Sequence, residues 1–198
     1  MEYCSSIIKH REKTICLVLF MCISTALSAQ KKITGIYRTM NDYLDKQLSY
    51  TADNGKASKI KLYTLAPKSY VTVSTASTST HIYKKDIFAY QLTSGEIYRI
   101  EGNHSYQILN NNPKLLLYKR KKPTSPKEGP PDQFKYYFSA PNGTMQALTT
   151  WNIKQAFADT HASLPDQVDA LFKRDAELLH YDSFRRMYKL EWLLNKSY

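Results

Sequence analysis

Residues 114–120, Lys-Leu-Leu-Leu-Tyr-Lys-Arg, and residues 134–140, Phe-Lys-Tyr-Tyr-Phe-Ser-Ala, are the two stretches that decide the fold. Aliphatic and aromatic side chains at this density favour β-strands. Because consecutive strands usually lie side by side, we predict that the two stretches pair as a long hairpin. Four prolines and three lysines lie between them, which predicts a solvated, mobile hairpin tip at residues 121–133. The alternative, a domain boundary, is disfavoured because too few apolar residues follow Phe138 to build an independent helical domain.

The segment before this hairpin has the same character. From about residue 60, β-branched and aromatic residues dominate, and polar turn clusters interrupt them about every ten residues. Thr-Ser-Gly at residues 93–95 and Gly-Asn at residues 102–103 supply turns in which glycine can adopt a positive φ. We therefore expect an antiparallel meander of about six to eight short strands, either open or curved into a barrel. The strands before the hairpin are predicted at residues 59–65, 70–73, 81–83, 87–92, 96–100 and around Tyr106 and Ile108, with residues 74–80 as a polar loop or edge.

The spacing of apolar residues changes to a helical period after residue 149. Thr149 or Thr150 is predicted to cap a short helix. Ser163, with Pro165 and Asp166 in the following turn, predicts the start of a second helix. A third helical stretch follows a break near residues 181–183. The apolar faces are predicted to comprise Ile153, Ala156 and Phe157, then Val168, Leu171, Phe172 and Leu179, and lastly Phe184, Met187, Tyr188, Leu190 and Leu194.

Together these patterns predict an α+β domain. Residues 35–140 are β-rich, residues 149–196 are helical, and two or three C-terminal helices pack on the sheet because their apolar faces need a surface to cover.

The N-terminus has the pattern of a secretory signal peptide at residues 1–29. A basic start precedes an apolar run at residues 15–27, and small residues lead to a predicted cleavage site between Ala29 and Gln30. The run is shorter than the roughly 20 residues that span a bilayer, so an uncleaved anchor is disfavoured and no transmembrane helix is expected after processing. Residues 30–198 would form a single exported domain, either periplasmic or secreted.

Two consequences follow from this leader. All three cysteines lie within the first 22 residues, so the processed chain would have no disulfide, thiolate nucleophile or cysteine metal ligand. A lipid anchor at Cys22 is a lesser alternative, because Phe20 and Met21 are bulky where such processing sites prefer small residues. The formal charge of the chain is +11, and losing the leader's three basic and two acidic residues leaves +10.

Basic residues interleaved with aromatic residues on the predicted hairpin are the clearest binding feature. Such a strip could contact an anionic polymer such as lipopolysaccharide, an acidic glycan or extracellular DNA. The purely structural interpretation is that tyrosines fill a half-exposed sheet while lysines keep an edge strand soluble. The candidate polyanion-binding residues are Tyr118, Lys119, Arg120, Lys121 and Lys122, opposite Lys135 and Tyr137.

No motif in the chain names a reaction. It has no nucleophile elbow and no glycine-rich phosphate loop, and Glu177 with His180 lacks the further ligands that a carboxylate-bridged metal site needs. We therefore predict no catalytic residue, no metal site and no cofactor.

Three segments carry a resemblance to a known group of proteins. They are Gly-Ile-Tyr-Arg-Thr at residues 35–39 with Asp-Tyr at 42–43, Tyr-Lys-Lys-Asp-Ile-Phe at residues 83–88, and the tail from residue 148 to 189. With a leader ending Leu-Ser-Ala-Gln, the chain resembles a group of secreted proteins from Bacteroidota. The resemblance implies export across the inner membrane, and it implies no assigned activity and no catalytic residue.

The sequence thus favours an exported, non-enzymatic binding or envelope-associated protein. Its expected partner is an anionic envelope polymer or another envelope protein. Two alternatives remain: a hydrolase of a cell-surface polymer that uses a carboxylate pair including Asp166 or Asp175, and a subunit of an envelope assembly.

Overall fold

The two decisive stretches pair as predicted. In the computed structural model, β9 (Leu116–Lys121) and β10 (Phe134–Ser139) form an antiparallel ladder in which Phe134 lies opposite Lys121 and Ser139 opposite Leu116. The structure describes residues 33–52, 59–63, 66–75, 77–122, 134–141 and 143–196. The tip was predicted at residues 121–133, but Lys121 is the last residue of β9. Residues 123–133 lie outside the described residues, as do the leader with Ala29 and Gln30 and the alternative anchor Cys22.

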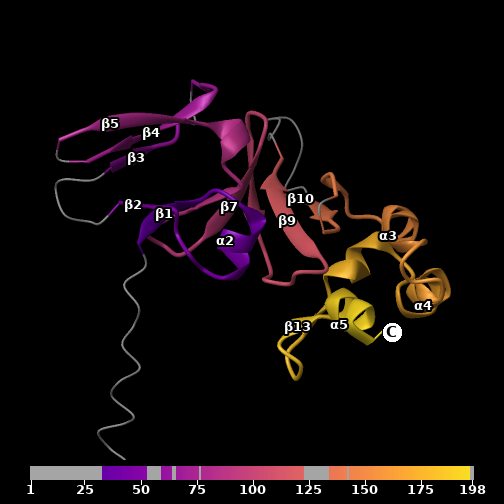
Figure 1. Ribbon diagram of the computed structural model, residues 1–198. Coiled ribbons are helices and arrows are strands. Elements are labelled where there is room, and N and C mark those ends of the chain that lie inside the picture. The colour runs from indigo at the N-terminus through magenta and orange to yellow at the C-terminus, as the bar shows by residue number, and fades with distance from the viewer. Residues whose placement is uncertain are drawn as a thin grey trace, which may run out of the picture. The chain divides into compact units, whose positions relative to one another are not determined.

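The hairpin belongs to an antiparallel sheet of eight strands in the order β11-β10-β9-β8-β7-β6-β1-β2 (Figure 1). From β6 to β11 each strand pairs with the next along the chain, which confirms the predicted meander. Strands β2 and β11 lie at the two edges, so the described sheet is open and does not close into a barrel. The remaining strands are β1 (Thr34–Tyr37), β2 (Tyr50–Ala52), β6 (Ala89–Gln91), β7 (Ile97–Glu101), β8 (His104–Ile108) and β11 (Gln146–Ala147).

The glycines of the two predicted turns have the conformation that the turns require. Gly95 has a φ of 85° and donates its backbone N–H to the Leu92 carbonyl over 2.8 Å, between β6 and β7. Gly102 has a φ of 58° between β7 and β8. A residue with a Cβ rarely adopts these values, so glycine fixes both connections.

Three predicted strands form a separate sheet instead of extending the meander. Strands β3 (Lys59–Lys61), β4 (Tyr70–Ser74) and β5 (Ser79–Tyr83) make a small antiparallel sheet in the order β3-β4-β5. Its apolar residues, including Val71 and Ile82, share a core cluster with Ile36, Tyr90 and Ile100 of the large sheet. The small sheet is therefore a second layer over one end of the large sheet.

Strand β9 is buried on both faces. Leu115 and Leu117 lie in a cluster with the C-terminal helices, whereas Leu116 and Tyr118 lie in a cluster with Tyr43 of α2 (Met40–Leu44). Leu115, which directly precedes β9, and Leu116, Leu117 and Tyr118 of the strand all have no exposed surface. The sheet therefore has a core on each side of this strand.

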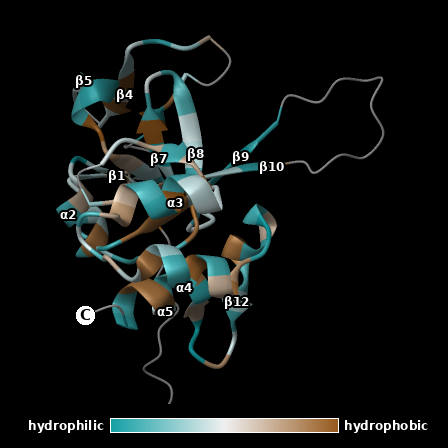
Figure 2. Cartoon of the chain, turned by 90° about the vertical axis from the view of Figure 1, so that its right-hand side faces the viewer, coloured by the Kyte–Doolittle hydropathy of each residue, from teal (hydrophilic) through white to brown (hydrophobic). Residues whose placement is uncertain are grey.

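Three helices follow the sheet, as predicted: α3 (Thr150–Phe157), α4 (Leu164–Leu171) and α5 (Lys189–Lys196). Each carries both hydrophilic and hydrophobic residues (Figure 2). Thr149 is the N-cap of α3, and its hydroxyl accepts the Asn152 backbone N–H over 3.1 Å. No helix in the described part of the chain is both long and apolar enough to cross a membrane.

The structure corrects the helical prediction between residues 172 and 188. Helix α4 ends at Leu171, Leu179 belongs to a short 3-10 helix η2 (Asp175–Leu179), and Phe184 lies in a turn between β12 (Tyr181–Asp182) and β13 (Met187–Tyr188). The reason is local, since the Asp182 carboxylate accepts backbone N–H groups of the turn and so favours a hairpin over a helix.

Close packing at Gly35 in β1 generates a first prediction. A Cβ there would lie 2.6 Å from both terminal methyls of Leu48 and 2.8 Å from the Tyr50 carbonyl oxygen. Because the carbonyl belongs to the paired strand β2 and cannot rotate away, Gly35→Ala should lower the free energy of unfolding by about 1–3 kcal/mol. Urea denaturation followed by circular dichroism measures this. Gly143→Ala, with its nearest atom at 3.3 Å, should have a clearly smaller effect, and equal effects would contradict the prediction.

Buried tyrosines generate a second prediction. Burial raises the pKa of Tyr37, Tyr43, Tyr90 and Tyr118 above the ordinary value for tyrosine. Above about pH 10 the unfolded chain therefore loses these protons before the folded chain does, and stability falls as pH rises. Each such tyrosine contributes a slope of up to about 1.4 kcal/mol per pH unit, which urea denaturation at increasing pH measures.

Two variants test the cause of this alkaline instability. Tyr43→Phe should make the loss of stability above pH 10 shallower, because it removes a buried ionisable group. Tyr83→Phe should leave the slope unchanged, since Tyr83 is 55% exposed. A slope that Tyr43→Phe does not alter would refute the assignment.

Candidate functional site

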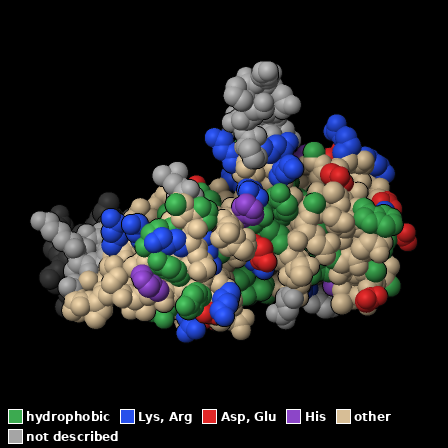
Figure 3. Space-filling model, turned by 90° about the horizontal axis from the view of Figure 1, so that it is seen from above, with side chains coloured by type: hydrophobic (Ala, Val, Ile, Leu, Met, Phe, Trp, Pro, Cys, Tyr) green, Lys and Arg blue, Asp and Glu red, His purple; other side chains and the backbone are tan. Residues whose placement is uncertain are grey.

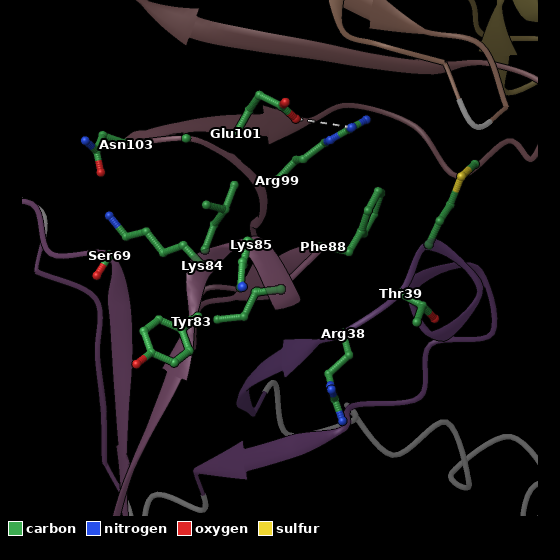
Figure 4. Close-up of a pocket in the computed structure, with 14 residues that line it drawn as sticks. Arg38, Thr39, Ser69, Tyr83, Lys84, Lys85, Phe88, Arg99, Glu101 and Asn103 are labelled. Atoms are coloured by element: carbon green, nitrogen blue, oxygen red, sulfur yellow. Dashed lines mark hydrogen bonds and ion pairs between the residues drawn. The ribbon is translucent and has the colours of Figure 1, made fainter.

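A pocket of about 730 Å³ lies where β1, β6 and β7 end against the small sheet. The turn that carries it is η1 (Lys84–Asp86), which leads from β5 of the small sheet back to the large one. Figure 4 shows the labelled side chains arranged around the space, with Lys84 and Lys85 projecting from η1. The lining residues are Arg38, Thr39, Met40, Ser69, Tyr83, Lys84, Lys85, Ile87, Phe88, Arg99, Ile100, Glu101, Gly102 and Asn103.

Backbone hydrogen bonds fix η1 between the two sheets. The Lys84 N–H donates to the Ser69 carbonyl over 2.8 Å, and the Phe88 N–H donates to the Tyr37 carbonyl over 3.0 Å. Lys85 lies over the ring of Tyr83, with its ammonium 5.8 Å from the ring centre. The two adjacent lysines are thus carried on a short turn that is tied at both ends.

Arg38 reaches the pocket from the connection between β1 and α2. Its backbone N–H donates to the Ser49 hydroxyl over 3.2 Å, and the next residue, Thr39, caps α2 together with Asp42. Hydrogen bonds from the Ser49 and Thr39 side chains lower the pKa of Asp42. This carboxylate is engaged in the cap and does not line the pocket.

Arg99 joins the pocket to the core of the sheet. Its Nη1 donates to the Tyr118 hydroxyl over 2.8 Å and to the Ser139 hydroxyl over 3.2 Å, and its Nη2 donates to Glu101 Oε2 over 3.2 Å. The Arg99 side chain is 16% exposed, and it lies 5.2 Å from the centre of the Phe88 ring. Arg99 is therefore a structural cation, and it already neutralises Glu101.

The charge that remains in the pocket is positive. Glu101 is the one acidic residue among the described residues that line it. Within the part of the chain that the structure describes, Arg38, Lys84 and Lys85 form no ion pair. Apolar side chains, among them Phe88 and Ile100, supply the rest of the lining. The arrangement suits a ligand that has an acidic group and a less polar body.

A second, smaller cavity adjoins the pocket. It has a volume of about 190 Å³ and shares Lys84, Ile100 and Asn103 with the larger one. Tyr63 and His104 also line it. The two cavities together form a longer binding surface than a single small anion needs.

The predicted strip on the hairpin does not form one surface. Residues directly opposite each other in a sheet share a face, and neighbours along a strand alternate. Tyr118 and Arg120 therefore share a face with Tyr137 and Lys135, while Lys119 lies on the other face. The remaining members of the strip are Lys121, which continues the face of Lys119, and Lys122, which follows the end of β9.

Individual residues of the strip have different roles. Tyr118 is fully buried, and its hydroxyl is 2.9 Å from the Ser139 hydroxyl, so it has no surface to offer a ligand. Arg120 lies over the Tyr106 ring and Lys119 over the Phe134 ring. Lys121 and Lys135 are exposed. Figure 3 shows basic side chains at several separate places on one face of the molecule.

Two of the acidic residues considered in the sequence, Asp175 and Glu177, make structural contacts. Asp175 accepts hydrogen bonds from the backbone and hydroxyl of Thr150, and Glu177 accepts them from Lys173 and Arg174. Neither these residues nor Asp166 line the two cavities. The described residues contain no group of three or more His, Cys, Asp or Glu side chains that could hold a metal ion.

The pocket was not identified from the sequence because its cations come from separate segments. Arg38 follows β1, whereas Lys84 and Lys85 precede β6, and the antiparallel pairing of β1 with β6 places both segments at the same pocket.

Comparisons of the chain with family models, curated proteins and solved structures gave no match. The resemblance to secreted proteins from Bacteroidota therefore stays a prediction.

The different roles of the pocket cations generate a third prediction. Arg99→Met removes the hydrogen bonds to Tyr118, Ser139 and Glu101, so it should lower the free energy of unfolding by about 1–3 kcal/mol. Lys85→Met, at an exposed position, should change it by about 0.5 kcal/mol or less. Urea denaturation of both variants measures the difference, and similar values would show that Arg99 is not a structural cation.

Proposed function

We propose that this chain is an exported, non-enzymatic binding protein that takes acidic units of an anionic polymer into the cationic pocket. The observation that carries the proposal is that Arg38, Lys84 and Lys85 all line one pocket, in which Glu101, the one carboxylate among the described lining residues, is paired with Arg99. Fixed cations in a partly enclosed space attract anions more strongly than the same charges on open surface, because the lower dielectric screens them less.

Two further observations favour a polymer over a small free anion. The adjoining cavity extends the binding surface beyond Lys84 toward Tyr63 and His104. The sequence also carries a large positive charge, and the exposed Lys121 and Lys135 add cations outside the pocket. A chain of acidic units could use the pocket for one unit and these cations for its neighbours.

Binding is a better account of the pocket than hydrolysis. Glycoside hydrolysis with two carboxylates needs a second acid across the ligand, and the described lining supplies only Glu101, which is paired. The proposal therefore assigns the cations to recognition and assigns no residue to a chemical step.

Charge reversal in the pocket is the fourth prediction. Lys84→Glu/Lys85→Glu should weaken binding to polygalacturonate, a carboxylated polymer, by about tenfold to hundredfold, because two attractions become repulsions. Lys59→Glu/Lys189→Glu is the matched control, since it changes the net charge equally at exposed positions outside both cavities. Isothermal titration calorimetry at two salt concentrations measures both, and wild-type binding should weaken with salt.

The hairpin cations give the experiment a second arm. If Lys121→Glu/Lys135→Glu abolishes binding while the pocket variant binds like the wild type, the polymer contacts the hairpin and the pocket assignment is wrong. Equal losses in the pocket variant and in the matched control would show attraction to net charge alone. Binding of uncharged dextran as tight as that of polygalacturonate would overturn the proposal altogether.

A further inference from the structure

The turn between β12 and β13 exposes a phenylalanine. Phe184 is 92% exposed, which is the largest exposure among the large hydrophobic residues that the structure describes. The two short strands pair through Tyr181 with Tyr188 and Asp182 with Met187. Figures 1 and 2, at right angles to each other, both show this hairpin extending beyond the C-terminal helices. Phe184 is thus held at a convex apex.

Asp182 fixes the shape of this apex. Its Oδ1 accepts the backbone N–H groups of Phe184 and Arg185, each over 3.0 Å, and its Oδ2 accepts Arg185 Nη1 over 2.5 Å. The turn closes through Arg186, which has a positive φ of 55°. A side chain presented by such a turn is already ordered, so binding through it requires little further loss of conformational freedom.

Arginines follow Phe184 in the chain, and two cations lie over the nearby Trp192 ring. The Arg185 guanidinium lies 4.9 Å from the centre of the Trp192 ring, and the Lys196 ammonium lies 5.1 Å from the same ring. Arg186 is exposed beside Phe184. The acid in the turn, Asp182, is already paired with Arg185. The hairpin therefore carries an exposed apolar side chain directly followed by two exposed arginines.

We propose that this hairpin is a membrane-surface contact, in which Phe184 enters the interface of a bilayer that contains anionic lipids. Aromatic side chains favour the boundary between headgroups and acyl chains, and nearby arginines are attracted to anionic headgroups. A protruding ring fits a deformable layer, whereas it needs a matching cavity on a protein partner. One ring and two arginines give weak, reversible binding. The inference stands independently of the pocket and its ligand.

Vesicle sedimentation tests the contact. The full processed chain should bind vesicles of phosphatidylcholine with phosphatidylglycerol more tightly than vesicles of phosphatidylcholine alone. Phe184→Ser should weaken binding to the anionic vesicles by about tenfold, and Arg186→Gln by about fivefold. Trp151→Ser is the matched control, because Trp151 is another exposed aromatic residue, on α3, at 65% exposure. It should bind like the wild type.

Tryptophan fluorescence tests whether the hairpin itself contacts the vesicles. The chain has two tryptophans, so Trp151→Phe leaves Trp192, which packs against Arg185 of the turn, as the single reporter. Its emission should change on addition of anionic vesicles and should not change in the Trp151→Phe/Phe184→Ser variant. Unchanged affinity in Phe184→Ser, an equal loss in Trp151→Ser, or equal binding to both vesicle types would each overturn the proposal.

Discussion

Burial of β9 on both faces is the constraint on which the rest of the structure depends. Leu117 packs toward the helices and Leu116 toward α2, and both surroundings are apolar. A one-residue slip in the pairing of β9 would move each of its side chains to the opposite face of the sheet. Because both faces are apolar, hydrophobic burial alone would not prevent such a slip. Polar contacts fix the register instead: the Asn110 amide donates to the Leu115 carbonyl over 2.8 Å and accepts the Leu117 N–H over 2.7 Å. The same amide donates to Glu191, over 2.8 Å, so α5 is tied to this point.

The other polar anchor of β9 connects the core to the pocket. The Tyr118 hydroxyl accepts a hydrogen bond from Arg99, and Arg99 in turn pairs with Glu101 at the rim. A cation required by the core thereby neutralises the acid that would otherwise oppose an anionic ligand. Stability and recognition are assigned to different residues, because Arg99 is engaged in the fold whereas Lys84 and Lys85 line the pocket without an ion pair among the described residues.

Local patterns predicted much of the fold and little of the site. The hairpin, the turn at Gly95 and the cap at Thr149 each depend on a few neighbouring residues, and all three were found. The small sheet was not separated from the meander, because its strands have the same local pattern and differ only in what they pack against. Phe184 was misassigned because its spacing to Met187 and Tyr188 imitates a helix. The alternation of side chains along a strand was enough to predict that the basic strip falls on two faces of the hairpin. The pocket, by contrast, could be found only by knowing which strands pair.

The two proposed contacts have different physical requirements and different places in the fold. The pocket depends on cations held in a recess beside the small sheet, and the apex depends on an ordered ring on a projection. Both views of the ribbon place the small sheet and the β12–β13 hairpin at opposite ends of the described unit (Figures 1 and 2). A chain resting on a bilayer through Phe184 would therefore hold the small-sheet end, and the pocket beside it, away from the lipid. In that orientation the negative surface would compete little for Lys84 and Lys85, because its potential falls off with a screening length of about 8 Å in physiological salt.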